Sequence, residues 1–281
     1  PFFIYNCFLS RDLLLCLCSL MTKKETITKP EEIKRVIPLA GGRQLTLSRP
    51  LVMGVLNVTP DSFSDGGAFD TPHKAVEHAL QMENEGADLI DIGGESSRPG
   101  AEPVEPELEM ERVLPVIEGI RKRSRVCISV DTCRVSTAEK ALDAGADMVN
   151  DISALRFDSA MVSLVADRKI PVVLMHMLGT PRDMQKSPGY SDCVGEILSF
   201  FDERIDYCRK HDVDKTKIII DPGIGFGKRL NDNLALLSNL SRFKKYGLPV
   251  LIGASRKSFI SMLHEGTGEP DQRIGGSIAA A

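Results

Sequence analysis

Seven short apolar runs recur along the chain, and longer stretches of mixed polarity separate them. Within each run the hydrophobic residues are continuous instead of alternating with polar ones. This pattern is typical of strands that are buried on both faces of a parallel sheet. The runs predict strands at residues 51–56, 89–92, 126–130, 148–149, 172–175, 218–220 and 250–252.

The stretches between the runs carry helix signals. Thr71 followed by Pro72 is typical of a helix N-cap and first turn, and Gly86 supplies a left-handed stop at the far end. Over residues 194–208, apolar side chains recur at helical spacing along one face. A weak repeat, Gly-Ala-Asp at 86–88 and again at 145–147, precedes two of the predicted strands. Strands that alternate with helices in this way indicate right-handed βα units.

The predicted fold class is α/β, a TIM (β/α)8 barrel with an N-terminal β-hairpin. The hairpin is expected over residues 35–50, where two short apolar segments flank Gly41 and Gly42, and it would plug the bottom of the barrel. Seven βα units are one fewer than a closed barrel needs. We therefore expect the eighth βα unit to be absent from this sequence. An open doubly wound sheet is the alternative.

One domain is expected over residues 35–281, with the hairpin at 35–50 and a C-terminally incomplete barrel at 51–281. Residues 1–34 form an extension that we expect to be partly non-native or disordered, because Met21 is the favoured start. A targeting segment and real structure are the alternatives for this extension. An open barrel would leave two unpaired strand edges, so the chain by itself is expected to be poorly stable and weakly active.

Composition and charge narrow the classes of function. The 42% hydrophobic and 26% charged residues are typical of a globular protein with a large core. A net charge of -4 argues against a broad nucleic-acid surface. The apolar run at residues 13–20 is too short to span a membrane. The seven cysteines lack the spacing of a zinc site, so we expect free thiols in a reducing, cytoplasmic compartment.

Polar residues end almost every predicted strand. They are Asn57, Asp91, Asp131, Asn150 with Asp151, His176, Asp221 and the group Ser255-Arg256-Lys257-Ser258. The carboxyl ends of the strands of a βα barrel meet at one face, so these side chains are expected to converge on a polar bowl above an apolar core. Any single Asp or Asn at such a place is equally well explained by its preference for turns. Their coincidence along the whole chain favours an active site.

Two long motifs make this pattern specific. Residues 57–67 read Asn-Val-Thr-Pro-Asp-Ser-Phe-Ser-Asp-Gly-Gly, and residues 91–100 read Asp-Ile-Gly-Gly-Glu-Ser-Ser-Arg-Pro-Gly. Both resemble signatures of the dihydropteroate synthases. Shorter matches to the same family follow in order at residues 129–132, 149–153, 175–177, 221–228 and 253–259. The resemblance covers the chain from residue 51 onward.

The resemblance implies a reaction of folate biosynthesis. In it, 6-hydroxymethyl-7,8-dihydropterin pyrophosphate and para-aminobenzoate condense to 7,8-dihydropteroate and pyrophosphate. The residues it implies around the pterin are Asp131, Asn150, Met175, Asp221, Arg256 and Lys257, and the catalytic residues are Asn57, Arg98, Asp131 and Lys257. A carboxylate such as Asp221 can hold the donor-rich edge of a pterin with two parallel hydrogen bonds.

The other substrate groups are assigned by the same resemblance. Pyrophosphate needs positive charge nearby as it leaves, so Asn57 is expected to bind a Mg²⁺ cofactor and Arg98 to approach the diphosphate. Para-aminobenzoate, and the sulfonamides that compete with it, are expected near Phe63, Ser97, Pro99, Phe226 and Ser258. No protein nucleophile is implied, because positioning and electrostatics carry the reaction. A homodimer through helices of the barrel wall is also implied.

Several alternatives stay open. The family continues into an eighth strand with an Arg-x-His motif that helps to bind pyrophosphate, and the sequence lacks this motif. A pterin-dependent methyltransferase shares the barrel, although the loop at 57–67 favours a diphosphate substrate. A barrel that binds pterin without turnover is the non-catalytic alternative. His176 fits packing as well as catalysis. Gly223, Gly225 and Gly227 match neither the Rossmann nor the P-loop spacing, so we expect them to let backbone pass close to the ligand.

Overall fold

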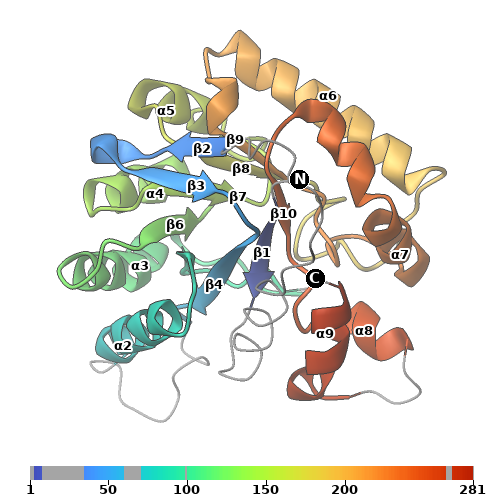
Figure 1. The fold of residues 1–281 in the computed structure, drawn as a ribbon, viewed down its shortest axis with the longest axis horizontal. Coiled ribbons are helices and arrows are strands. Elements are labelled where there is room, and N and C mark those ends of the chain that lie inside the picture. The colour runs from blue at the N-terminus through green and yellow to red at the C-terminus, as the bar shows by residue number, and fades with distance from the viewer. Residues whose placement is uncertain (1–2, 8–34, 60–70, 99, 264–267, 281) are drawn as a thin grey trace, which may run out of the picture.

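The computed structural model describes residues 3–7, 35–59, 71–98, 100–263 and 268–280 (Figure 1). Within these residues, eight parallel strands form a closed barrel in the order β1-β10-β9-β8-β7-β6-β5-β4. The strands are β1 (Phe3–Cys7), β4 (Leu51–Asn57), β5 (Leu89–Gly93), β6 (Cys127–Asp131), β7 (Met148–Asp151), β8 (Val172–Met175), β9 (Ile218–Asp221) and β10 (Val250–Ile252). All seven predicted strands are confirmed, and the alternative of an open doubly wound sheet is wrong.

Strand β1 occupies the position between β10 and β4 that the seven predicted units leave open. Phe3 pairs in register with Val250, and Ile4 pairs with Leu51. The expected pair of unpaired strand edges is therefore wrong for the described residues. The physical reason is that a short strand-forming segment can satisfy the free N–H and C=O groups of both edges, even when it comes from far away in the sequence.

Helices surround the barrel on the outside (Figure 1). They are α2 (Thr71–Asn84), α3 (Pro106–Arg121), α4 (Val135–Asp143), α5 (Met161–Arg168), α6 (Cys193–Lys210), α7 (Leu230–Ser238), α8 (Ser258–Leu263) and α9 (Ile274–Ala280). Short 3-10 turns are η1 (Ala40–Gly42), η3 (Lys215–Lys217), η4 (Leu240–Tyr246) and η5 (Pro270–Arg273). Helices α2 and α6 match the two predicted helices, and Gly86 follows α2 with a φ of 110°.

Side chains alternate along each strand and so contribute to two separate cores. The outward residues, such as Ile90, Val130 and Ile220, pack beneath the helices. The inward residues of the lower barrel are Met53, Leu89, Cys127, Met148, Val173, Ile219 and Leu251, and they pack against the hairpin residues Ile37, Leu39, Leu45 and Leu47. Burial on both faces explains why the strand sequences are continuously apolar.

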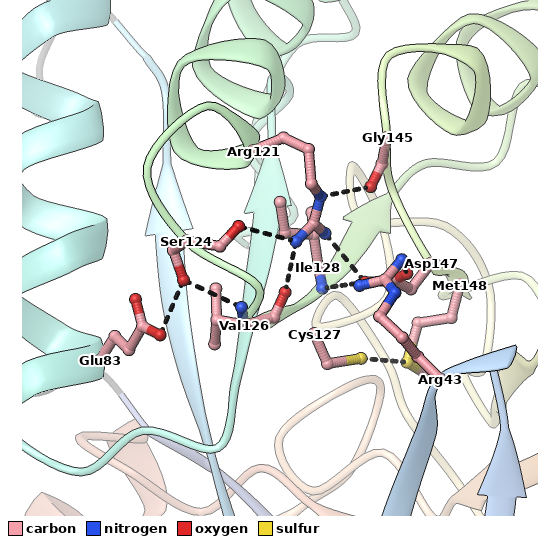
Figure 2. Close-up of polar contacts among 10 residues, drawn as sticks. All are labelled: Arg43, Glu83, Arg121, Ser124, Val126, Cys127, Ile128, Gly145, Asp147 and Met148. Carbon is pink, nitrogen blue, oxygen red and sulfur yellow. Dashed lines mark hydrogen bonds and ion pairs between the residues drawn. The ribbon is translucent and has the colours of Figure 1, made fainter. Parts of the chain in front are cut away.

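The predicted hairpin consists of β2 (Arg35–Pro38) and β3 (Gln44–Leu47), which pair antiparallel. Arg43, just before β3, forms an ion pair with Asp147 at the start of the β7 region (Figure 2). Asp147 is fully buried. Its Oδ2 also accepts hydrogen bonds from Arg121 Nη2 and from the backbone N–H of Ile128, both at 2.9 Å. The lower end of the barrel is thus closed by an apolar plug and a satisfied ion pair.

The Gly-Ala-Asp repeat contains the same hydrogen-bonding arrangement twice, in which the aspartate accepts from a backbone N–H and pairs with an arginine. Asp88 accepts a hydrogen bond from the N–H of Val52 at 2.8 Å, as Asp147 does from Ile128 at 2.9 Å. Asp88 also forms an ion pair with Arg49 at 2.5 Å. Each aspartate therefore joins the start of its own strand to the start of the preceding strand.

Candidate active site

The polar residues at the strand ends meet in one row at the carboxyl face of the barrel. In the sheet register Asn57 lies beside Gly93, Gly93 beside Asp131, and Asp131 beside Asn150. Gly93 lies between the two side chains, since a Cβ there would be in van der Waals contact, at 3.6 Å, with both Asn57 Oδ1 and Asp131 Oδ2. An amide oxygen and a carboxylate oxygen therefore flank the same point at the barrel mouth.

The strands on the other side of the barrel complete the bowl. Met175 lies beside Asp221 in the register of β8 and β9, and both side chains are buried. Lys257 follows β10, and its ammonium nitrogen lies 4.1 Å from the centroid of the Phe226 ring. The charge of Lys257 also interacts with Asp221 and Asp131. The bowl predicted from the sequence is thus formed by side chains from strands that are far apart in the chain.

Burial perturbs the ionisable groups of this bowl. It raises the pKa of Asp221 to about 6, against the opposing effects of the Gly223 N–H and of two lysines. Burial also raises the pKa of Asp131, and the nearby charge of Asp91 adds to that effect. Burial lowers the pKa of Lys257 to about 8, although Asp221 and Asp131 favour its charged form. Perturbed carboxyls and a lysine gathered in one concave site are typical of a functional site.

One wall of the bowl is apolar and rich in thioethers. Met175, Met177 and Met184 form a buried cluster, and Ile152 and Phe226 pack against it. Flexible, polarizable methionines suit the face of a flat aromatic ligand. The sequence analysis assigned Met175 to the pterin and Phe226 to para-aminobenzoate. It assigned no role to the other three residues, because isolated apolar residues in loops look like any other core residue.

A cavity of about 600 Å³ continues from Asp131 between the loops that follow β5 to β8. Ser97, which the sequence analysis assigned to the para-aminobenzoate pocket, lines it together with Arg134. Arg134 Nη1 donates to Glu95 Oε2 at 2.6 Å and to Glu109 Oε2 at 2.8 Å. Arg134 was not predicted, but it anchors the loop that carries Ser97.

The loop after β9 is anchored by a buried lysine that the sequence analysis did not single out. Lys228 Nζ donates to Phe226 O at 3.0 Å and to His176 O at 3.2 Å, and it lies 3.0 Å from His176 Nδ1. Burial lowers the pKa of Lys228 to about 7 and that of His176 to about 2. His176 is therefore neutral, and it packs edge-on against Phe200 with 4.9 Å between centroids. Its contacts are those of a packing and hydrogen-bonding residue.

The glycines of this loop approach protein backbone. A Cβ on Gly223 would lie 2.0 Å from His176 O, and one on Gly227 would lie 2.6 Å from Leu178 O. Both residues have positive φ, at 71° and 63°. Close approach was predicted for these glycines, but in the structure the partner they approach is the loop after β8.

The remaining predicted residues lie at the edge of the bowl or outside the described residues. Arg98 is exposed in the loop after β5, and Ser258 is exposed at the start of α8. Arg256 has a φ of 56°, and its backbone N–H donates to Ser277 Oγ at 2.9 Å. Phe63 and Pro99 fall outside the described residues.

The described residues also bear on metal binding and membrane insertion. No cluster of three or more His, Cys, Asp or Glu side chains that could hold a metal ion occurs in that part of the chain. The oxygens of Asn57 and Asp131 at Gly93 are nevertheless the hard donors that Mg²⁺ prefers, and Mg²⁺ usually takes only one or two protein ligands. None of the described helices has the length and apolar character needed to cross a membrane.

Known proteins are similar to this chain in both sequence and fold. A family model described as "Pterin binding enzyme" matches residues 53–281. The dihydropteroate synthase of Escherichia coli (strain K12) is 46% identical over 243 residues, which are 86% of this chain and 85% of that protein. A solved structure of Xanthomonas albilineans dihydropteroate synthase with 4-aminobenzoic acid is 48% identical, with a TM-score of 0.82 over 88% of this chain and 87% of that one.

A second structure of the Xanthomonas albilineans enzyme, in complex with 7,8-dihydropteroate, is 46% identical with a TM-score of 0.78, and it covers 87% of both chains. The family model spans the strands whose ends form the bowl, and the resemblance carried by the motifs is confirmed. Sequence, fold and site geometry agree on one conclusion. The chain belongs to the dihydropteroate synthases, pterin-binding enzymes of folate biosynthesis.

Proposed function

We propose that the bowl binds the pterin ring of 6-hydroxymethyl-7,8-dihydropterin pyrophosphate and condenses it with para-aminobenzoate. The observation that carries this proposal is the convergence of Asn57, Asp131, Asn150, Asp221 and Lys257 at one barrel mouth. Asp221 would accept hydrogen bonds from the guanidine-like edge of the ring. Asp131 and Asn150 would contact the remaining nitrogens, and Lys257 would donate to the carbonyl side.

The thioether wall supports the placement of a flat ring. Met175 and Phe226 belong to one apolar cluster beside Asp221, so a ring held by the carboxylate would lie against them. Arg256 is proposed as a further contact at the rim. A dry pocket strengthens the hydrogen bonds to the ring, because little water competes for the same groups.

The chemistry needs leaving-group stabilisation and orientation. The C–O bond between the pterin methylene and the diphosphate breaks, a C–N bond to the arylamine forms, and the amine releases one proton. The proposed role of Arg98 is to offset the charge that develops on the diphosphate, and Lys257 stabilises the pterin. No covalent intermediate with the protein is required, so the side chains act by holding the two reactants in line.

A Mg²⁺ ion fits the donor set at the mouth. Asn57 would hold it, with Asp131 nearby, and the bound ion would supply positive charge to the phosphate oxygens. Para-aminobenzoate is proposed to bind near Ser97, Phe226 and Ser258, together with Phe63 and Pro99. Sulfonamides are then expected to compete for that place.

The direct test mixes the chain with Mg²⁺, the dihydropterin pyrophosphate and para-aminobenzoate, and follows pyrophosphate release and dihydropteroate formation. We expect both products in equal amounts, and only when para-aminobenzoate is present. Calorimetry with the pterin pyrophosphate alone separates binding from turnover. Tight binding with no product would favour the non-catalytic alternative, and no binding would contradict the proposal altogether.

We further propose a cytoplasmic homodimer. The described cysteines Cys127, Cys133, Cys193 and Cys208 are free thiols, which suits a reducing compartment. Met262 and Leu263 at the end of α8 are 62% and 57% exposed and would add apolar area to a contact between barrel walls. Analytical ultracentrifugation at micromolar concentration should show a species of twice the chain mass, and a single monomeric species would contradict the dimer.

A further inference from the structure

Asp91 lies one layer below the predicted bowl. Strand β5 continues to Gly93, so Asp91 is in mid-strand and on the same inward face as Leu89 and Gly93. Leu89 belongs to the apolar lower core, and Gly93 belongs to the row at the mouth. Asp91 is only 2% exposed, and it therefore forms the floor of the site.

Two polar side chains, Asn150 and Ser129, face the floor carboxylate. Asn150 Nδ2 donates to Asp91 Oδ2 at 2.9 Å, across three neighbouring strands. Asp91 Oδ1 is buried, and the hydroxyl of Ser129, the register neighbour of Asp91 in β6, faces this carboxylate. A buried carboxylate is costly even with two polar neighbours, which argues against a role in stability alone.

A carboxamide has one donating end and one accepting end, and the two are nearly identical in shape. A carboxylate beside it removes this ambiguity, because an ionised carboxylate only accepts. Burial raises the pKa of Asp91 to about 6, so the group is largely ionised at neutral pH. Asn150 Nδ2 is then directed to Asp91 on the floor, and Asn150 Oδ1 lies at the other end of the same carboxamide.

We propose that Asp91 is a positioning residue that orients the Asn150 carboxamide so that the pocket presents an oxygen acceptor to the ligand. This inference rests on the proposed binding of a pterin. With Asn150 fixed, the bowl presents acceptors from Asn150, Asp131 and Asp221 to a ring edge of N–H donors. Asp91 thereby acts on ring recognition through Asn150, without touching the ligand.

A double-mutant cycle tests whether Asp91 acts through Asn150. The variants are Asp91→Ala, Asn150→Ala and the pair, and the measurement is calorimetric affinity for the dihydropterin pyrophosphate, with melting curves as a check of folding. We expect Asp91→Ala to weaken binding about tenfold, the effect of one misdirected hydrogen bond. In the Asn150→Ala background the same change should weaken binding less than about twofold.

Matched variants sharpen the cycle. Asp91→Leu removes the acceptor without leaving a cavity, and it should reproduce Asp91→Ala if the latter folds poorly. Asp91→Asn should recover most of the affinity, because the introduced carboxamide oxygen can still accept from Asn150. Ser129→Ala removes the other polar neighbour of Asp91 and leaves the acceptor for Asn150 in place, so it should change the affinity less than about twofold. The KM for para-aminobenzoate should stay within about twofold in every Asp91 variant, as expected for additive, separate sites.

Additive losses at the two positions, or full affinity in both Asp91→Ala and Asp91→Leu, would overturn the inference. A wild-type chain that binds no pterin would overturn the proposed function instead. The two failures are therefore distinguishable, since the first needs normal wild-type binding and the second excludes it.

Discussion

At the bottom of the barrel, the carboxylate of Asp147 is fully buried. It forms ion pairs with Arg43 and Arg121 and accepts a hydrogen bond from the N–H of Ile128 (Figure 2). Asp221 at the mouth and Asp91 on the floor beneath it are almost as deeply buried. Burial raises the pKa of both groups to about 6. The same residue type is therefore used in two opposite ways within one barrel.

The difference follows from what each end has to do. Charges at the bottom are paired during folding, so they join the hairpin and neighbouring strands without needing a ligand. Asp221 at the mouth is desolvated ahead of binding, and a ligand with N–H donors would relieve that cost. A buried carboxylate that awaits a ligand reduces stability and serves function, whereas a buried carboxylate paired within the protein adds stability and binds no ligand. Four predictions test this contrast.

The largest effect is expected from Asp221→Ala. Removing the carboxylate deletes two charge-assisted hydrogen bonds to the proposed pterin, so kcat/KM should fall about 10³-fold, or about 4 kcal/mol. Stability should stay equal or rise, because a desolvated charge is lost. Steady-state kinetics and urea unfolding of the same preparation check both parts. A variant that keeps activity, or one that simply unfolds, would remove the contrast between the two ends.

Asp147→Asn, at the bottom of the barrel, should reduce stability and leave activity unchanged. Losing the charge leaves Arg43 and Arg121 without their carboxylate, and the free energy of unfolding should fall by about 3 kcal/mol. The two arginines are partly exposed, so the cost should lie at the lower end of values for buried pairs. Activity per folded molecule should not change. Urea unfolding and active-site titration separate the two quantities.

The raised pKa values of Asp91 and Asp221 predict a pH dependence of stability. Between about pH 4 and pH 6 the folded state binds more protons on Asp91 and Asp221 than the unfolded state does, so stability must fall as the pH rises through that window. Each group should contribute on the order of 2 to 3 kcal/mol. Chemical unfolding at several pH values measures the slope. Asp221→Asn should flatten it, and an unchanged slope in that variant would contradict the assignment.

The strands and the row of polar residues at their ends were predictable because burial on both faces leaves a continuous apolar run followed by a polar residue. Asn57, Asp131 and Asn150 are found in that row. The depth of a side chain within the barrel was not predictable in the same way. Asp91 also follows an apolar run, yet β5 extends two residues further, which places its side chain on the floor of the site.

Contacts between loops were also beyond the reach of sequence patterns. Lys228 and Arg134 are anchors only because their partners come from other strands, and nothing in their immediate neighbours marks them. The closing strand β1 shows the same limit, because its register with Val250 and Leu51 depends on which edges are left free. Long-range partners of this kind are set by the assembled barrel.

The smallest expected effect tests whether burial, and not the ion pair itself, gives the bottom its strength. Asp88 repeats the arrangement of Asp147, because each carboxylate accepts from an N–H of the preceding strand and pairs with an arginine. The side chains of the Arg49–Asp88 pair are 51% and 18% exposed. Those of the Arg43–Asp147 pair are 33% and 0% exposed. Water screens the Arg49 pair, so Arg49→Ala should cost about 0.5 kcal/mol, and salt should reduce that further. Arg43→Ala removes a partner from a dry carboxylate and should cost about 2 kcal/mol with little effect of salt. Equal costs in urea unfolding would mean that the two copies of the repeat are equivalent and that depth in the barrel does not decide what a charge contributes.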